Sequence, residues 1–269
     1  TRLFYVEVSE PDMHEPSGDF ERLKIALQDQ WEIRDVELDF FQFNKLQKTL
    51  RQGNWAVTVA IFNDHTSTPP RIVEIWPGLY EEGLYGLAID LGSTTIAAHL
   101  TDLKSGEVLK SAGLMNPQIR FGEDLMSRVS YSMMNSGGDK EMTIVVQEAI
   151  NRLAEQLRKE TEIEKNSLVE VVFVCNPVMH HLLLGIDPVE LGQAPFALAS
   201  SNSITVNASH LGLSNMNPSG RCYILPCIAG HVGADAAAVA LSEEPNKSDD
   251  LVLVVDVGTN AEILLGNKS

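Results

Sequence analysis

The middle of the chain alternates short apolar runs with amphipathic stretches, and this pattern predicts a mixed α/β domain. Three strands in quick succession are followed by two helical stretches, and then by strands and helices in alternation. The predicted strands are 85–91, 95–101, 107–114, 169–175 and 222–225, and the predicted helices are 123–134, 139–163, a short one from Pro177, and 232–241. With the two consecutive helical stretches counted as one segment, the order is β-β-β-α-β-α-β-α, with an irregular segment predicted at 193–220.

A shorter pattern stands on each side of this domain. Residues 1–84 alternate predicted strands at 3–8, 55–62 and 71–76 with two helical stretches, which predicts a small α+β domain without recognisable chemistry. Residues 251–257 and 261–265 then form a further pair of predicted strands. We therefore expect three parts: 1–84, 85–250 and 251–269. We also expect the chain to be truncated at both ends, because it starts inside a strand and stops just after this last pair.

The last pair of strands repeats a motif from the start of the middle domain. Ala88-Ile89-Asp90-Leu91-Gly92-Ser93-Thr94-Thr95 returns as Val254-Val255-Asp256-Val257-Gly258-Thr259-Asn260-Ala261. In each copy an apolar strand brings an aspartate to its carboxyl end, and a glycine two residues later allows close approach of backbone. Successive N–H groups in such a turn bind anions, and the aspartate offers a hard oxygen to magnesium. A single copy is also typical of an ordinary hairpin turn, but two copies predict a phosphate site.

The candidate site residues follow from these two corners. Asp90 and Asp256 are the predicted metal-positioning and catalytic carboxylates, which would place magnesium and the attacking water. Asp235 stands at a predicted helix start, where it is either a catalytic base or an acid stabilised by the helix dipole. Contacts to phosphate and cofactor are predicted for Gly92, Ser93, Thr94, Thr95, Gly230, Gly233, Gly258, Thr259 and Asn260. The hydroxyl and amide groups among them could instead satisfy their own turns.

Two further groups of polar residues have weaker assignments. His180 and His181 are adjacent, so on a helix they point in different directions, and we expect packed or capping side chains rather than metal ligands. Asn116, Gln118 and Asp124 are expected to line either the cleft or a partner surface.

Charge and cysteine content narrow the function. The 37 acidic and 20 basic residues give a formal net charge of −17, which disfavours binding to nucleic acid or to anionic membranes. No apolar run is long enough to span a bilayer and no secretory signal is present, so we expect a cytoplasmic protein. Three cysteines are too few for a four-cysteine iron–sulfur cluster.

The repeated motif and the element order resemble the superfamily of acetate and sugar kinases, heat-shock chaperones and actin, whose lobes have a ribonuclease H-like fold. Within that superfamily the chain is similar to the reductive activators of corrinoid proteins. The segments that carry this second resemblance are Asn116-Pro117-Gln118, Phe121-Gly122-Glu123-Asp124, Ser127-Arg128, Asn176 to Leu182, Gly185 to Pro188, and Pro226 to Asp235.

The resemblance implies an actin-like ATPase lobe that binds ATP and Mg²⁺ and assists reduction of a corrinoid protein from Co(II) to Co(I). The electron would come from a [2Fe–2S] domain of the parent protein that this chain does not contain. The family analogy also allows a homodimer, although the sequence identifies no surface for one. The alternatives are a small-molecule kinase of the same superfamily and a non-catalytic module that docks a corrinoid protein.

Overall fold

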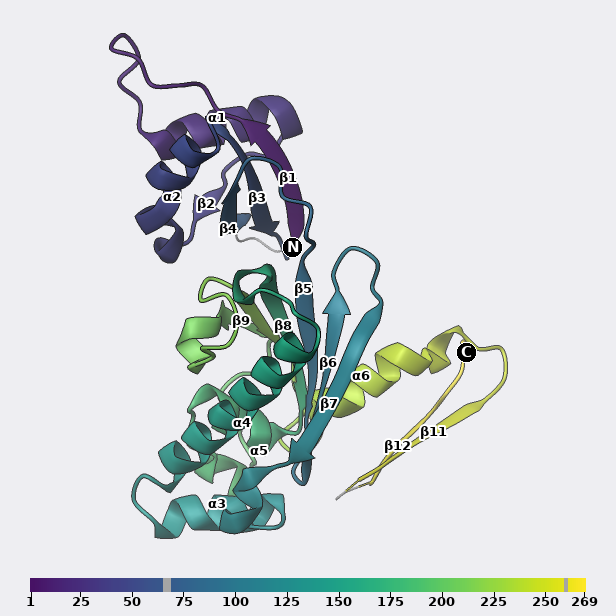
Figure 1. Cartoon of the computed structure of the whole chain (residues 1–269). Coiled ribbons are helices and arrows are strands. Elements are labelled where there is room, and N and C mark those ends of the chain that lie inside the picture. The colour runs from purple at the N-terminus through teal and green to yellow at the C-terminus, as the bar shows by residue number, and fades with distance from the viewer. Residues whose placement is uncertain (65–68, 259–260) are drawn as a thin grey trace.

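Three separate sheets organise the chain in the computed structural model, which describes residues 1–64, 69–258 and 261–269. Figure 1 shows a small N-terminal unit stacked on a larger central sheet, and a hairpin near the C-terminus that projects to one side. No helix within these described ranges is long and apolar enough to cross a bilayer.

The N-terminal unit packs two helices on a four-stranded sheet of order β1-β3-β4-β2. Its elements are β1 (Arg2–Glu7), α1 (Asp19–Trp31), β2 (Glu37–Leu38), α2 (Phe40–Gln52), β3 (Ala56–Phe62) and β4 (Arg71–Pro77). Leu23 and Leu27 of α1 and Leu50 of α2 are fully buried against Val57 and Ile72 of the sheet. This apolar contact fixes the unit because isolated helices of 13 residues are marginal in water.

The central sheet has six strands in the order β7-β6-β5-β8-β10-β9. These strands are β5 (Tyr85–Leu91), β6 (Thr95–Asp102), β7 (Val108–Met115), β8 (Leu168–Cys175), β9 (Ile204–Asn207) and β10 (Arg221–Ile224). The first three are antiparallel neighbours, whereas β8 runs parallel to both β5 and β10. The carboxyl ends of β5 and β8 therefore meet at one edge of the sheet, which is where open α/β sheets bind ligands.

Helices cover the central sheet and complete its core. They are α3 (Leu125–Met134), α4 (Gly138–Glu160), α5 (Pro177–Leu184) and α6 (Ala234–Glu243). Met142, Val146 and Leu153 of α4 are buried against Leu100 and Phe173 of the strands, as the helical spacing predicts.

The prediction of an irregular segment at 193–220 was wrong for β9. Its four residues pair antiparallel with β10, so the observed order contains one strand more than the predicted β-β-β-α-β-α-β-α. Ile204–Asn207 is too short to show a clear alternation and has polar neighbours, so its strand conformation depends on pairing with β10 rather than on local sequence.

A buried polar network joins the N-terminal unit to the central sheet. The Asp39 carboxylate accepts hydrogen bonds from Ser219 Oγ and Asn207 Nδ2, both at 2.7 Å, and Glu74 accepts one from Asn217 Nδ2 at 2.8 Å. A small apolar cluster lies beside them: Ala60, Val73, Leu84 and Val169. The two units are thus in direct, specific contact.

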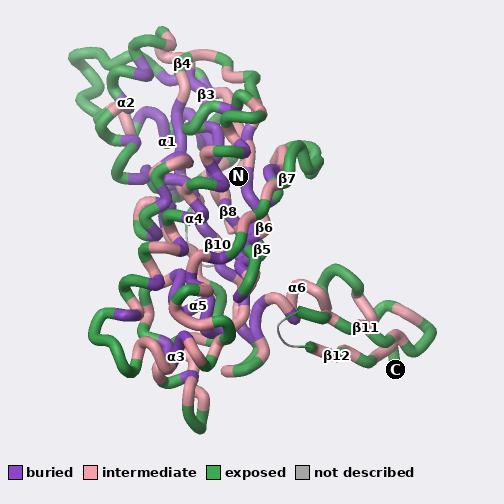
Figure 2. Tube along the Cα trace, turned by 60° about the horizontal axis from the view of Figure 1, so that its bottom comes forward, coloured by how far each residue is buried: buried purple, intermediate pink, exposed green. Residues whose placement is uncertain are grey.

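The C-terminal hairpin is far less buried than the rest of the chain. It consists of β11 (Val252–Val257) and β12 (Ala261–Gly266), which pair only with each other. Leu253, Val257 and Ile263 each leave more than half of their surface exposed, and Figure 2 shows both strands without buried positions. Within the described part of the central domain, four 3₁₀ turns connect its strands and helices: Pro117–Phe121, Lys165–Ser167, Val189–Gly192 and Ala208–Leu211.

Candidate functional site

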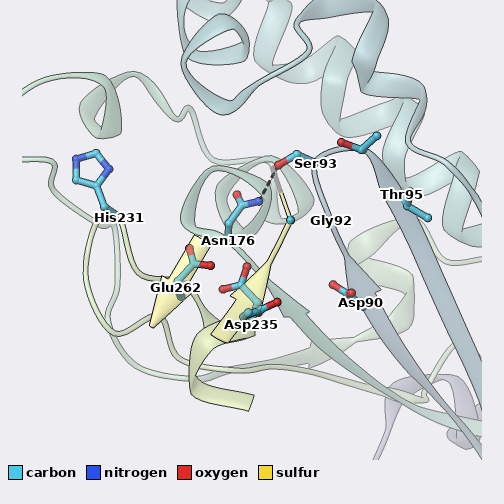
Figure 3. A pocket seen from close by; sticks show the side chains of 12 residues that line it. Asp90, Gly92, Ser93, Thr95, Asn176, His231, Asp235 and Glu262 are labelled. Atoms are coloured by element: carbon cyan, nitrogen blue, oxygen red, sulfur yellow. Dashed lines mark hydrogen bonds between the residues drawn. The ribbon is translucent and has the colours of Figure 1, made fainter. Parts of the chain in front are cut away.

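A crevice of about 430 Å³ opens between the carboxyl end of β5, the start of α6 and the C-terminal hairpin. Its lining includes most of the predicted site residues. They are Asp90, Gly92, Ser93, Thr94, Thr95, Gly233, Asp235, Asp256 and Gly258, together with Asn176, His231 and Glu262. Figure 3 shows that these side chains come from separate elements and surround one opening.

The first corner, residues 90–95, is a tight turn between β5 and β6. The N–H of Gly92 donates to the carbonyl of Thr95 at 3.0 Å, which closes the turn. A Cβ on Gly92 would stand 2.7 Å from that same carbonyl oxygen, so the turn requires glycine. Ser93 is almost fully buried, and its hydroxyl accepts a hydrogen bond from Asn176 Nδ2 at 3.1 Å.

The second corner, residues 256–261, brings Asp256 and Gly258 to the same crevice. Thr259 and Asn260 lie outside the described residues. The two hairpins differ in register: Asp90 stands opposite Ala97 in the first, seven positions along the chain, whereas Asp256 stands opposite Glu262 in the second, six positions along. Because a shift of one residue turns a side chain to the other face, Glu262 faces the crevice beside Asp256.

Asp235 enters the crevice from the first turn of α6. The helix starts close to β8, because a Cβ on Gly233 would lie 2.6 Å from the carbonyl oxygen of Cys175 and 2.5 Å from Cα of Asn176. The carboxylate accepts the N–H of Ala236 at 3.0 Å, so one of its oxygens serves the helix terminus. Because this hydrogen bond uses only one carboxylate oxygen, the predicted role of Asp235 at the helix terminus does not exclude its predicted role as a base.

The crevice is strongly acidic. Burial, with the neighbouring charges of Asp235 and Asp256, raises the pKa of Asp90 above its ordinary value. Burial and the charge of Asp256 likewise raise the pKa of Asp235, and burial with both aspartates raises that of Glu262. Among the residues that the structure describes, no three His, Cys, Asp or Glu side chains converge closely enough to hold a metal ion by themselves. A cation held here would need ligands from a bound molecule or water.

Asn176 lines the crevice, although the sequence did not predict it as a site residue. It caps α5 by accepting the N–H of Met179 at 2.9 Å, and its amide nitrogen donates to Ser93 (Figure 3). An asparagine before Pro177 is a recognisable helix cap, but its second contact crosses between strands and could not be read from local sequence.

The structure does not bring Gly230 into the crevice lining. A Cβ on Gly230 would stand 2.0 Å from the carbonyl oxygen of Phe196, so this glycine permits close packing of two loops. The neighbouring His231 does line the crevice, and its ring lies 4.1 Å from that of Phe196.

The remaining polar motif residues lie outside the crevice lining. Asn116 and Gln118 are fully buried, so they line neither the crevice nor an exposed surface, and Asp124 caps α3 by accepting the N–H of Ser127 at 2.7 Å. His180 and His181 are buried on α5 as expected, and burial lowers the pKa of His180 to about 4.

Fold and crevice together define the class: a mixed α/β protein in which two similar strand-to-turn corners and a helix start surround an acidic opening. Comparison with known proteins then shows to which family the chain belongs. Residues 85–248 match the family model described as the RACo middle region, and residues 1–82 match the RACo linker region. The chain belongs to the family of reductive activators of corrinoid proteins.

Individual relatives agree with this family. The corrinoid activation enzyme RamQ of Eubacterium limosum is 32% identical over 198 residues, covering 73% of this chain and 33% of RamQ. The [Co(II) methylated amine-specific corrinoid protein] reductase of Methanosarcina barkeri is 28% identical over 200 residues, covering 68% of this chain and 34% of the reductase. The chain thus spans about a third of the length of these curated relatives.

A solved structure is also similar over almost the whole chain. It is that of a reductive activator for corrinoid,iron-sulfur protein, which superposes with a TM-score of 0.87 at 34% identity. The superposition covers 99% of this chain and 42% of that protein. The mixed α/β fold described above is therefore that of a corrinoid reductive activator.

Proposed function

We propose that the chain is the ATP-binding part of a reductive activator that returns Co(II) corrinoid proteins to Co(I). The observation that carries this proposal is the meeting of two similar corners, led by Asp90 and Asp256, at one crevice. Membership of the family supports the reaction, and the corners support a nucleotide as the source of free energy.

We further propose that the central sheet is an actin-like, ribonuclease H-like lobe. Three antiparallel strands beside parallel β8 and β10 support this assignment, and so does the family boundary near residue 84. On this proposal residues 1–84, 85–250 and 251–269 are a middle domain, the first lobe and the start of the second lobe.

The crevice has the chemistry that MgATP requires. Mg²⁺ keeps several waters and commonly uses one or two carboxylates with substrate phosphates, so it needs no complete cage of protein ligands. Asp90 and Asp256 would hold the ion or its waters, and the two corners would hold phosphates. Asp235, with its raised pKa, is suited to orient a water or accept its proton. Bound MgATP would supply the free energy that assists an uphill electron transfer.

The electron must reach cobalt from outside this chain. Cys175, Cys222 and Cys227 are all buried, and burial raises the pKa of Cys222 to about 12 and that of Cys227 to about 11. Such thiols stay protonated and are poor cluster ligands. We therefore assign the one-electron reduction of Co(II) to a [2Fe–2S] domain of the parent protein and the corrinoid protein to the role of partner. A homodimer and a cytoplasmic location stay predictions.

The test is ATP-dependent reduction of a Co(II) corrinoid protein by the full-length parent protein, followed through loss of the Co(II) electron paramagnetic resonance signal. Asp90→Asn and Asp256→Asn should each slow ATP turnover and cobalt reduction by about 100-fold or more, since each removes charge that positions the reacting groups. Asp29→Asn, on the exposed face of α1, is the matched control and should leave both rates unchanged.

Other outcomes would select the alternatives. Undiminished turnover in both aspartate variants would reject the site. A phosphorylated small molecule as product, without stimulation by a corrinoid protein, would favour a kinase. Nucleotide-independent binding of a Co(II) corrinoid protein, without ATP turnover, would favour a docking module.

A further inference from the structure

Three fully buried polar side chains lie directly behind the first corner. They are Asn116, at the start of the 3₁₀ turn Pro117–Phe121; Gln118, in that turn; and Arg128, on α3. We call these three residues the loop cradle. All three belong to the segments that carry the resemblance to corrinoid activators, and none of them lines the acidic crevice.

The loop cradle holds successive backbone carbonyls of the first corner. Asn116 Nδ2 donates to the carbonyl of Gly92 at 2.8 Å, and the N–H of Asn116 donates to that of Thr94 at 2.8 Å. Between them, the Arg128 guanidinium donates to the carbonyl of Ser93. In a planar trans peptide the next N–H points opposite to the carbonyl. These bonds therefore turn the N–H groups of residues 93, 94 and 95 away from the cradle, and the loop lines the crevice on its other side.

Arg128 carries a buried positive charge among neutral partners. Besides Ser93, its guanidinium donates to the Gly122 carbonyl at 3.1 Å, to Gln118 Oε1 at 3.3 Å and to Met179 Sδ at 3.1 Å. Among the described residues no carboxylate lies within ion-pair distance of it. Burial lowers its pKa to about 10, while the charge of Asp124 acts in the opposite direction, and Arg128 stays charged at neutral pH. Asp124 is exposed and forms no ion pair with Arg128, so within the described part of the chain the buried cation has no direct anionic partner, which is costly for a purely structural anchor.

Gln118 fixes the other side of the guanidinium. Its Nε2 donates to the carbonyl of Met142 on α4 at 2.8 Å, and its backbone N–H donates to Asn116 Oδ1 at 2.9 Å. The loop cradle is therefore connected to both α3 and α4, and these two helices hold it in place behind the loop.

We propose that Asn116 and Arg128 are positioning residues for phosphate binding: they fix the first corner with its amides turned from the cradle and place a buried positive charge one peptide behind the bound phosphate. This inference rests on the proposed function. The ligand class is a polyphosphate, whose negative charge compensates the guanidinium across the loop.

The test compares binding of magnesium tripolyphosphate to the full chain by isothermal titration calorimetry. Arg128→Lys keeps the charge but loses the forked donor geometry, and we expect roughly tenfold weaker binding. Arg128→Met loses both, and we expect roughly 100-fold weaker binding. Arg152→Met, at an exposed position of α4, is the matched control and should bind as the wild type does.

A second readout separates positioning from general stability. In amide nuclear magnetic resonance spectra, tripolyphosphate should shift the N–H signals of residues 92–95 in the wild-type chain. In Arg128→Lys these shifts should shrink while the signals of residues 1–64 stay native. If Arg128→Met does not fold, the lysine variant decides.

Two results have distinct meanings. Wild-type affinity and wild-type amide shifts in a folded Arg128→Lys variant would overturn the positioning role and leave the phosphate site standing. No binding by the wild-type chain, or binding unaffected by Asp90→Asn, would reject the phosphate site itself and the inference with it.

Discussion

The two corners share a sequence motif but not an environment. The first is enclosed: Leu91 and Ile96 are fully buried beside it, and the loop cradle holds its carbonyls from behind. The second is open, since Val257, which corresponds to Leu91, leaves 75% of its surface exposed. The motif therefore specifies a local turn, whereas the rigidity of that turn comes from residues distant in sequence.

The largest expected difference between the corners is in stability. Leu91→Ala removes a fully buried side chain from the central core and should lower the free energy of unfolding by about 2–5 kcal/mol. Val257→Ala removes exposed surface and should change it by less than about 0.5 kcal/mol. Urea unfolding of both variants measures this, and equal losses would show that the second corner is as firmly packed as the first.

Two glycine substitutions compare the packed start of α6 with the open strand β12 that follows the second corner. Gly233→Ala would place a Cβ against the backbone of Cys175 and Asn176, where little can yield, and should cost about 1–3 kcal/mol. Gly266→Ala, in β12, meets nothing within 4 Å and should be neutral or slightly stabilising. Thermal unfolding compares the two, and a Gly233→Ala protein with unchanged Tm would contradict the close approach of α6 to β8.

The smallest expected effect concerns the crevice carboxylates. Because the folded-state pKa of Asp235 is raised, its ionised form destabilises the folded protein. This penalty grows as pH rises from the unfolded pKa, about 4, through the folded pKa, and is complete above it. Asp235→Asn should therefore raise Tm slightly at pH 7, and the gain should vanish below about pH 4.

A pH series of melting temperatures checks this last prediction, with Asp29→Asn as the exposed control. A gain that is constant with pH, or larger in acid, would show that Asp235 is not destabilised by its surroundings. Added Mg²⁺ should reduce the gain, since the cation offsets the same repulsion.

The sequence predicted much of the fold because its strongest patterns are local. The strand at 85–91 and the apolar face of α4 follow directly from hydrophobic periodicity. The aspartates of both corners were recognisable because their motif occurs twice. Their meeting at one crevice was an expectation of that repeat, and the structure places both there.

The residues that sequence could not place depend on distant partners. β9 exists because β10 offers an edge. Glu262 faces the crevice because the second hairpin closes one residue earlier than the first. Arg128 and Asn116 converge on one loop from different elements, and no spacing along the chain encodes that meeting.

On our proposal, both corners hold one polyphosphate and its metal ion. The decisive experiment is a double-mutant cycle of Asp90→Asn and Asp256→Asn, measured by calorimetric binding of MgATP to the full chain. We predict that each single variant weakens binding and that the double variant loses clearly less than the sum of the two, because the partners share one ligand. Strictly additive losses, or a loss from one aspartate alone, would contradict a shared site.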